Sequence, residues 1–312
     1  MKIRYFIRYT GAALILASPL AFIVPTSVYA LDLLQSFAFH AMLGYAGLAF
    51  LLLLFYRGWW GTATMCAALL LLVFLKPYIA QEPMPKLTDG QAFRVAHFNV
   101  LYSNRHFEPT IRRALASEAD LLSFQEVDQR WADSLEARLQ DTYPYYEIVT
   151  ETRASRGMAV FSKYPLTHVQ VHHWSGTPNL TGDIELSDSA IHFVASHVYS
   201  PRTEQDYRDR NRQIQQITAY LATIEGPVLA IGDFNAVPWN PYIVQMRQQA
   251  RLYDSRRSLA PTYPAALRSG GIPIDYVFHS DEIAFLSFYA VRAGGSDHRG
   301  VIGTYLIKDG AS

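Results

Sequence analysis

The chain has 312 residues with 27 basic and 27 acidic side chains, a balance that hides two unlike parts. Residues 1–80 carry five basic side chains and one acid, which leaves 22 basic and 26 acidic side chains, a net charge of −4, for residues 81–312. Affinity for a nucleic-acid backbone comes mostly from Lys and Arg, so the acidic part is a poor candidate for binding long nucleic acid. The single cysteine, Cys66, excludes an intrachain disulfide.

Three apolar stretches follow one another in the first part of the chain. They cover about residues 11–31, 37–56 and 62–80, and each is close to the roughly 20 residues with which a helix crosses a bilayer. The sequence therefore predicts three transmembrane helices in residues 1–80. The first stretch has an alternative interpretation as a cleavable signal peptide, because it follows basic residues and its apolar run leads to Val28-Tyr29-Ala30.

Basic residues beside these stretches predict their orientation. Lys2, Arg4 and Arg8 favour a cytoplasmic N-terminus, and Arg57 favours a return of the second loop to the cytoplasm. Three crossings then place the rest of the chain outside the cytoplasm. The expected location is the inner (cell) membrane, as a multi-pass protein in contact with the lipid bilayer.

The remaining residues divide into a linker and one globular domain. Residues 81–92 are polar and contain prolines, which is typical of a linker. The predicted strands lie at 93–100, 120–127, 145–149, 157–162, 166–172, 191–198, 228–231, 273–279, 283–291 and 301–307, and the predicted helices at 108–119, 130–140, 203–224 and 241–249. Strands that alternate with helices, mixed with consecutive strands, predict a layered α/β domain over residues 93–312.

Polar side chains stand within, after or shortly before many of these strands. They are Asn99, Glu126, His197, Asp233, Asn235, Asp275, Asp297 and His298. Each has a plain structural explanation, such as a turn hydrogen bond for Asn99 or an ion pair of Glu126 with Arg130. Their recurrence favours a site instead, because the ends of buried strands converge on one edge of an α/β sheet.

The segment from Val228 to Asn235 shows this pattern most clearly. Four apolar residues predict a buried strand, Gly232 permits a turn, and an acid and an amide follow. Asp233 and Asn235 are two residues apart, so they point the same way if the extended geometry continues. Asp and Asn beside Gly and Pro are also ordinary turn residues.

In chain order, the motifs consist of Asn99, Gln125-Glu126, His197, Gly232-Asp233-Phe234-Asn235, Ile274-Asp275-Tyr276 and Ser296-Asp297-His298. This series resembles the endonuclease/exonuclease/phosphatase (deoxyribonuclease I-like) superfamily over about residues 93–308, and the segment 156–166 resembles its strand before the central hairpin. The preceding apolar stretches look like its bacterial membrane-anchored branch. The residues after Asn235 depart from the pattern of its inositol phosphatases.

The resemblance implies a four-layer α/β sandwich, two facing β-sheets flanked by helices, with the site at one edge. It also implies a divalent metal, usually Mg²⁺, and hydrolysis of a phosphate ester. Because Mg²⁺ prefers carboxylate and amide oxygens, Glu126 with Asn99 is the expected metal site, and Asp297 joins it or holds a second ion. Mn²⁺ is the alternative metal.

The remaining residues suit in-line attack of water on the phosphorus. Asp233 is the candidate general base, while Asn235 and His197 can donate hydrogen bonds to phosphate oxygens. His298, oriented by Asp275, could bind the phosphate in its protonated form. The residue types leave the base role open between Asp233 and His298.

The predicted function is a membrane-anchored, metal-dependent phosphodiesterase. The candidate substrates are a phospholipid headgroup, nucleic acid or a small phosphodiester, and the loop 251–271 with Tyr263 is a candidate for the mouth of the site. The alternative is a catalytically silent, membrane-tethered binding or scaffold protein on the same fold. The sequence predicts no oligomeric state.

Overall fold

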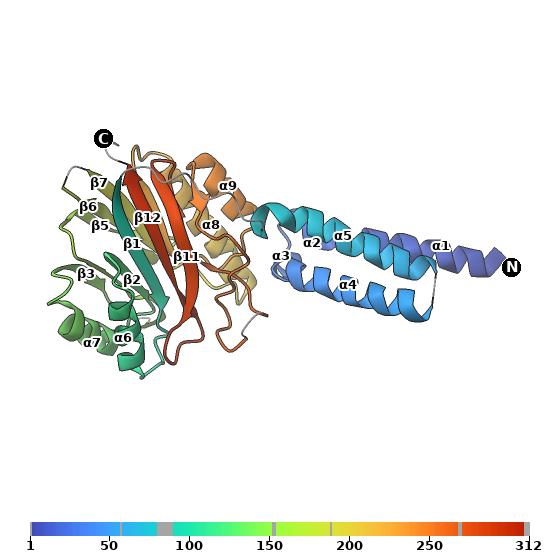
Figure 1. Ribbon diagram of the computed structural model, residues 1–312, viewed down its shortest axis with the longest axis horizontal. Helices are drawn as coiled ribbons and strands as arrows, with labels where there is room; N and C mark the ends of the chain where they lie inside the picture. Colours follow the sequence, from blue (N-terminus) through green and yellow to red (C-terminus); the bar gives the residue numbers. More distant parts are fainter. Residues whose placement is uncertain are drawn as a thin grey trace. The chain divides into compact units, whose positions relative to one another are not determined.

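The computed structural model describes residues 2–56, 58–79, 90–151, 154–187, 189–267 and 270–308. The chain forms two compact units, one of Met1–Ala80 with Trp239–Pro241 and one of Gln81–Pro238 with Tyr242–Ser312 (Figure 1). Most of the predicted linker, residues 81–89, lies outside the described residues. The same holds for Arg57 and for the side chains of Lys2, Arg4 and Arg8, on which the orientation of the predicted spans depends.

The first unit is helical. Its helices are α1 (Lys2–Ala17), α2 (Leu20–Ile23), α3 (Tyr29–Gln35), α4 (Ala38–Phe55) and α5 (Trp59–Ile79). By length and composition, α4 and α5 are the two helices in the described part of the chain that are long and apolar enough to cross a membrane. Core helices of soluble proteins and signal sequences share those properties. The first predicted span, 11–31, is divided among α1, α2 and α3, so three crossings stay a prediction.

The second unit contains two six-stranded mixed sheets. The first sheet, in spatial order, consists of β11 (Ile283–Arg292), β12 (Arg299–Lys308), β1 (Gly90–Asn99), β2 (Leu121–Gln125), β4 (Met158–Ser162) and β3 (Tyr145–Val149). The second consists of β5 (Leu166–Trp174), β6 (Thr177–Glu185), β7 (Ala190–Ser196), β8 (Val228–Asp233), β10 (Asp275–His279) and β9 (Tyr253–Asp254). The pairs β1/β2 and β7/β8 are parallel, and the other pairs are antiparallel.

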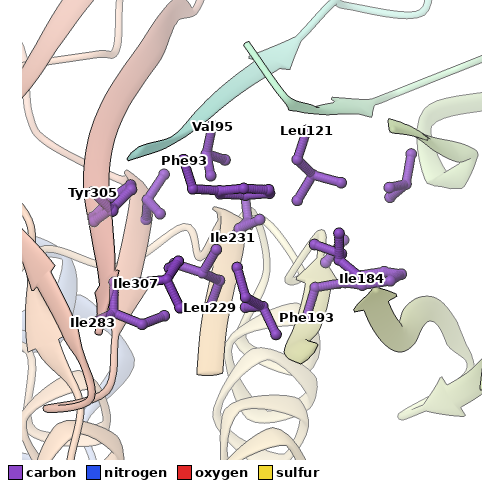
Figure 2. Close-up of a cluster of buried hydrophobic side chains, with 14 of the residues drawn as sticks. Phe93, Val95, Leu121, Ile184, Phe193, Leu229, Ile231, Ile283, Tyr305 and Ile307 are labelled. Atoms are coloured by element: carbon purple, nitrogen blue, oxygen red, sulfur yellow. The ribbon is translucent and has the colours of Figure 1, made fainter. Parts of the chain in front are cut away.

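Apolar side chains from both sheets meet in one core, so the two sheets face each other. Figure 2 shows Phe93, Val95 and Leu121 of the first sheet above Phe193 and Leu229 of the second. These side chains are fully buried, and the water-excluded area between the sheets is the main favourable contribution to folding. This core fixes the separation of the sheets at the edge where the polar residues lie.

Helices cover the outer faces of the two sheets. Helices α6 (Phe107–Ala116) and α7 (Gln129–Leu139) pack on the first sheet through a cluster that includes Trp131. Helices α8 (Glu204–Leu221) and α9 (Pro241–Gln249) pack on the second through a cluster that includes Phe234. A short 3₁₀ helix, Ala154–Arg156, precedes β4. The domain therefore has the layered α/β arrangement that the sequence predicts.

Strand β6 is the main element that sequence patterning missed. It lies inside the second sheet between β5 and β7 and is buried on both faces over most of its length. Its buried residues include Asn179 and Thr181. Polar side chains in a strand covered on both sides give neither an apolar run nor an alternating pattern, so this strand has no clear signal.

Gly232 in β8 has a conformation and surroundings that exclude other residues. Its φ is +145°, and an added Cβ would collide with the Ser196 carbonyl oxygen and with Gln125 Nε2. We expect Gly232→Ala to lower the free energy of unfolding by about 2–3 kcal/mol, because it adds overpacking to an unfavourable φ. The measurement is urea unfolding of the full-length protein followed by tryptophan fluorescence.

Gly226 offers the matched control for this substitution. Its φ is +90°, but nothing lies within 4 Å of an added Cβ. Gly226→Ala should therefore cost only about 1 kcal/mol, the part that comes from the backbone conformation. Equal losses for the two variants would contradict the close packing at Gly232.

Candidate functional site

Strand topology brings the predicted polar residues to one edge of the two sheets. Asn99 ends β1, and Glu126 directly follows the parallel neighbour β2. In the second sheet, His197 follows β7, and Asp233 at the end of β8 pairs with Asp275 at the start of β10. Asp297 and His298 directly precede β12, the antiparallel neighbour of β1.

Asn99 connects the two sheets at this edge. Its Nδ2 donates to Glu126 Oε1 at 3.2 Å and to Asp233 Oδ2 at 3.3 Å. Its Oδ1 accepts a hydrogen bond from the Leu101 backbone N–H. The amide is fully buried, so it holds the two carboxylates in a fixed relation.

His298 lies between two buried carboxylates. Its Nδ1 is 3.0 Å from Asp275 Oδ2, and its Nε2 is 3.7 Å from Asp233 Oδ2. A second histidine, His97 on β1, approaches Asp275 Oδ1 with its Nε2 at 3.4 Å and has its Nδ1 within hydrogen-bond distance of Ser123 Oγ. Asp275 thus lies between two imidazole rings, and no part of Asp275 is exposed.

These contacts shift the protonation of the buried groups. Burial raises the pKa of Asp233 to about 8. Burial alone would lower the pKa of His298, but the Asp275 and Asp233 carboxylates outweigh it and raise the pKa to about 10. Burial would raise the pKa of Asp275, but the charge and hydrogen bond of His298 hold it below its usual range. The geometry and these shifts favour an imidazolium at His298 near neutral pH.

A titration of His298 tests this electrostatic arrangement. In the metal-free protein, ¹⁵N NMR of the imidazole should give a pKa for His298 near 10, and Asp275→Asn should lower it by about 1–3 pH units. Because the folded-state pKa of His298 exceeds the ordinary value of 6.5, the ion pair of His298 with Asp275 makes its full contribution to stability below about pH 6.5. That contribution is lost as the pH rises through about 10. A His298 pKa near 6.5 in the parent protein would contradict the arrangement.

His197 and Asn235 complete the surroundings of Asp233. His197 Nε2 lies 3.8 Å from Asp233 Oδ2, and burial lowers the pKa of this histidine, which favours its neutral form. The Asn235 N–H donates to Asp233 Oδ1, and Asn235 Nδ2 donates to the Val198 carbonyl. Asn235 has φ +47°, so the extended geometry ends at Asp233 and the two side chains are not related by strand alternation.

A pocket of about 430 Å³ opens at this edge. Six of the predicted residues line it: Glu126, His197, Asp233, Asn235, Asp297 and His298. Asn99 and Asp275 are fully buried and contact Asp233 and His298, which do line it. The structure therefore gathers all eight sequence-predicted residues at one place.

Arg156, a residue to which sequence reasoning assigned no role, also lines the pocket. Arg156 donates to the Gly176 carbonyl and to the hydroxyl of Tyr199, over whose ring its guanidinium lies. Arg156 and Tyr199 are 43 positions apart in the sequence, so no local sequence pattern predicts their contact. Tyr263, from the predicted mouth loop, also lines the pocket and lies with its ring centroid 4.9 Å from that of His298. His97 was missed as well, although a histidine inside an apolar strand is itself a signal.

Two groups of residues at the pocket have ligand atoms suited to a divalent metal. Asp233, Asp275 and His298 each offer one ligand atom, all within 4.8 Å of one another, and so form a candidate metal site. Both ring nitrogens of His298 face carboxylates, however, which also suits a buried ion pair. Glu126 and Asp297 present carboxylates at the pocket, and carboxylate oxygens are ligands that Mg²⁺ prefers. Asn99, the third predicted ligand, has its Nδ2 toward Glu126 and its Oδ1 toward the Leu101 N–H.

Comparisons with known proteins give the family and the fold of the chain. The model of the Endonuclease/Exonuclease/phosphatase family matches residues 96–298. A solved endonuclease/exonuclease/phosphatase from Beutenbergia cavernae DSM 12333 is 21% identical with a TM-score of 0.56, covering 71% of this chain and 72% of that one. Sphingomyelinase C from Streptomyces griseocarneus is 20% identical with a TM-score of 0.51, covering 69% and 99%.

A third similar structure is D. rerio TDP2 complexed with a single-strand DNA product. It is 12% identical with a TM-score of 0.56 and covers 69% of this chain and 99% of that one. No curated protein matches the chain. At these identities the structural likenesses establish a shared fold.

Proposed function

The chain belongs to the endonuclease/exonuclease/phosphatase family and is a phosphoester hydrolase, and we propose that water attacks the phosphorus of a phosphodiester in line, with Asp233 as the general base. One observation carries the proposal. Asp233 is buried at the pocket, with the Asn99 amide and the His197 and His298 rings all directed at one of its oxygens. These contacts hold the carboxylate in one orientation. A general base must be held in this way because it has to lie within hydrogen-bond distance of the water that it deprotonates.

Glu126, Asn99 and Asp297 are the proposed ligands of the divalent metal. Glu126 is half-buried, and its Oε2 also accepts the Tyr102 backbone N–H, which fixes the carboxylate at the pocket. When bound, Mg²⁺, or Mn²⁺ in its place, polarises the phosphoryl oxygen and stabilises negative charge on the leaving group.

We assign the base role to Asp233 on geometric grounds. His298 faces a carboxylate at each ring nitrogen, which favours a proton on both. The ring then has no free nitrogen with which to accept the proton of a water. In its ionised form, whose basicity the raised pKa increases, Asp233 takes the proton of the attacking water. The positive charge of His298 favours the anionic phosphate beside it. These contacts support Asp233 over His298 for the base role that the sequence leaves open.

Two neutral donors act on the phosphate oxygens. Asn235 Nδ2 uses one N–H for the Val198 carbonyl and has a second, because an amide nitrogen carries two. His197 is neutral and can donate from one ring nitrogen. Asn235 is held by its contact with the Val198 carbonyl, and a donor fixed in this way costs little reorganisation as charge develops in the transition state.

Turnover by the full-length protein tests the proposal. The panel consists of bis-p-nitrophenyl phosphate, plasmid DNA, RNA and phospholipid vesicles, each with Mg²⁺ and with a chelator. We expect chelator-sensitive hydrolysis of at least one of them. A folded protein that binds but does not cleave any of them would instead support the silent binding or scaffold protein.

We propose that the helical unit anchors the enzyme in a membrane with the catalytic domain outside the cytoplasm. Helices α4 and α5 have the length and composition of spans, and the basic residues near the N-terminus favour a cytoplasmic start. An enzymatic reporter fused after Ser312 should be active only outside the cytoplasm. Activity restricted to the cytoplasm would contradict the three-span orientation.

A further inference from the structure

Gln125 joins the two sheets directly beneath the pocket. It is the last residue of β2 in the first sheet, and no part of it is exposed. Its Oε1 accepts a hydrogen bond from the Asp233 backbone N–H at 2.9 Å, and its Nε2 donates to the Ser196 carbonyl at 2.5 Å. One side chain from the first sheet thus contacts the ends of both β7 and β8 in the second.

The two contacts need an amide and no other side chain of this size. The Asp233 N–H is a donor and requires an acceptor, while the Ser196 carbonyl is an acceptor and requires a donor. A glutamine supplies both at its tip. A glutamate would set a carboxylate oxygen against the Ser196 carbonyl, and a methionine would leave two buried polar groups unpaired.

The sequence leaves space for this side chain at Gly232. A Cβ at that position would collide with Gln125 Nε2 and with the Ser196 carbonyl. The absence of a side chain at Gly232 is therefore what lets the amide reach across to β7. Gln125 and Gly232, 107 positions apart, form one complementary contact.

We propose that Gln125 is a positioning residue for the hydrolysis. It fixes the backbone of Asp233, and that of Ser196 next to His197, against Asn99 and Glu126 of the first sheet. The Asn99 amide contacts the Asp233 side chain, but it can do so only if the Asp233 backbone is in the right place. This inference rests on the proposed function, because its main measurable consequence is the rate of the chemical step.

A double-mutant cycle separates positioning from a structural role. Gln125→Met keeps the volume and removes both hydrogen bonds. We expect it to lower kcat for bis-p-nitrophenyl phosphate about 10–100-fold with a small change in KM, since small misplacements of a catalytic group have costs of this size. In a protein that already carries Asp233→Asn, the same change should lower kcat less than about 3-fold, because the group it places is gone.

Gln125→Glu distinguishes the two contacts. It keeps an acceptor for the Asp233 N–H and loses the donor for Ser196, so its kcat should fall between those of the parent and of Gln125→Met. Tyr143→Phe is the matched control, because it also removes one buried hydrogen bond, to the Ala119 carbonyl, but away from the pocket. It should destabilise the fold without changing kcat.

A second measurement is independent of turnover. Hydrogen exchange of the peptide that contains the Asp233 amide should be faster in Gln125→Met than in the parent and unchanged in Tyr143→Phe. Equal effects of Gln125→Met on kcat with and without Asp233→Asn, or unchanged exchange at Asp233, would overturn the inference. A parent protein without any turnover would overturn the proposed hydrolysis, and hydrogen exchange would still decide whether Gln125 positions Asp233.

Discussion

Asp233→Asn should lower kcat by about 10²–10⁴-fold, the usual contribution of a positioned general base. Asparagine has the same shape and keeps an acceptor oxygen, but it cannot take a proton from water. The measurement is steady-state hydrolysis of whichever substrate the full-length protein turns over best, with Mg²⁺ present. KM should change much less than kcat, because the proton is transferred only in the transition state.

Stability measurements separate this loss of rate from a loss of fold. Asparagine can accept only one of the two hydrogen bonds that the Asp233 carboxylate accepts, from Asn99 Nδ2 and from the Asn235 N–H, so we expect the free energy of unfolding to fall by about 1–3 kcal/mol in a protein that still folds. Asp183→Asn is the matched control, since Asp183 accepts hydrogen bonds from His168 and His192 outside the pocket. An Asp233→Asn variant as active as its parent would exclude the assigned base.

Glu126→Gln should weaken the binding of the divalent metal. We expect the apparent affinity for Mg²⁺ to fall at least about 100-fold and kcat at limiting metal to fall in parallel, because a charged oxygen ligand is lost from a hard-ion site. Titration with Mn²⁺ by calorimetry gives the affinity and the number of ions without any turnover. Activity should return in part at high Mg²⁺.

The same titration decides between the two candidate metal sites. Glu136→Gln is the control, because Glu136 lies on α7 and accepts the Tyr146 hydroxyl at the surface. If metal affinity is unchanged in Glu126→Gln but lost in Asp275→Asn, the ion binds among Asp233, Asp275 and His298. The buried ion-pair interpretation of those three residues would then be wrong.

Apolar patterning predicted much of the fold because most strands have a clear apolar or alternating run. The strand before Gly232 is the clearest example, and the observed β8 extends it by two residues to Asp233. Strand β6 escaped because its buried face includes polar side chains. The alternation of strands and helices predicted a layered α/β domain, but the four-layer arrangement came from the motif resemblance, since periodicity alone does not say which sheets face each other.

The site was predictable to the extent that its residues end strands. Asn99, Glu126 and Asp233 follow that rule. Parallel pairing brings the ends of β1 and β2 together in the first sheet, and those of β7 and β8 together in the second. The relation of Asp233 to Asn235 was not predictable, because it depends on a positive φ at Asn235. The contact of Arg156 with Tyr199 and the reach of Gln125 arise from tertiary packing and have no local signature.

The chain order of the two sheets has a consequence for synthesis. The second sheet comes entirely from residues 166–279, whereas the first is completed only by β11 and β12 near the end of the domain. A nascent chain that ends at His279 lacks Asp297, His298 and the strand that pairs with β1. With the roles proposed for Asp297 and His298, we expect the hydrolase to stay inactive during synthesis until the last strand has been made and has completed the first sheet.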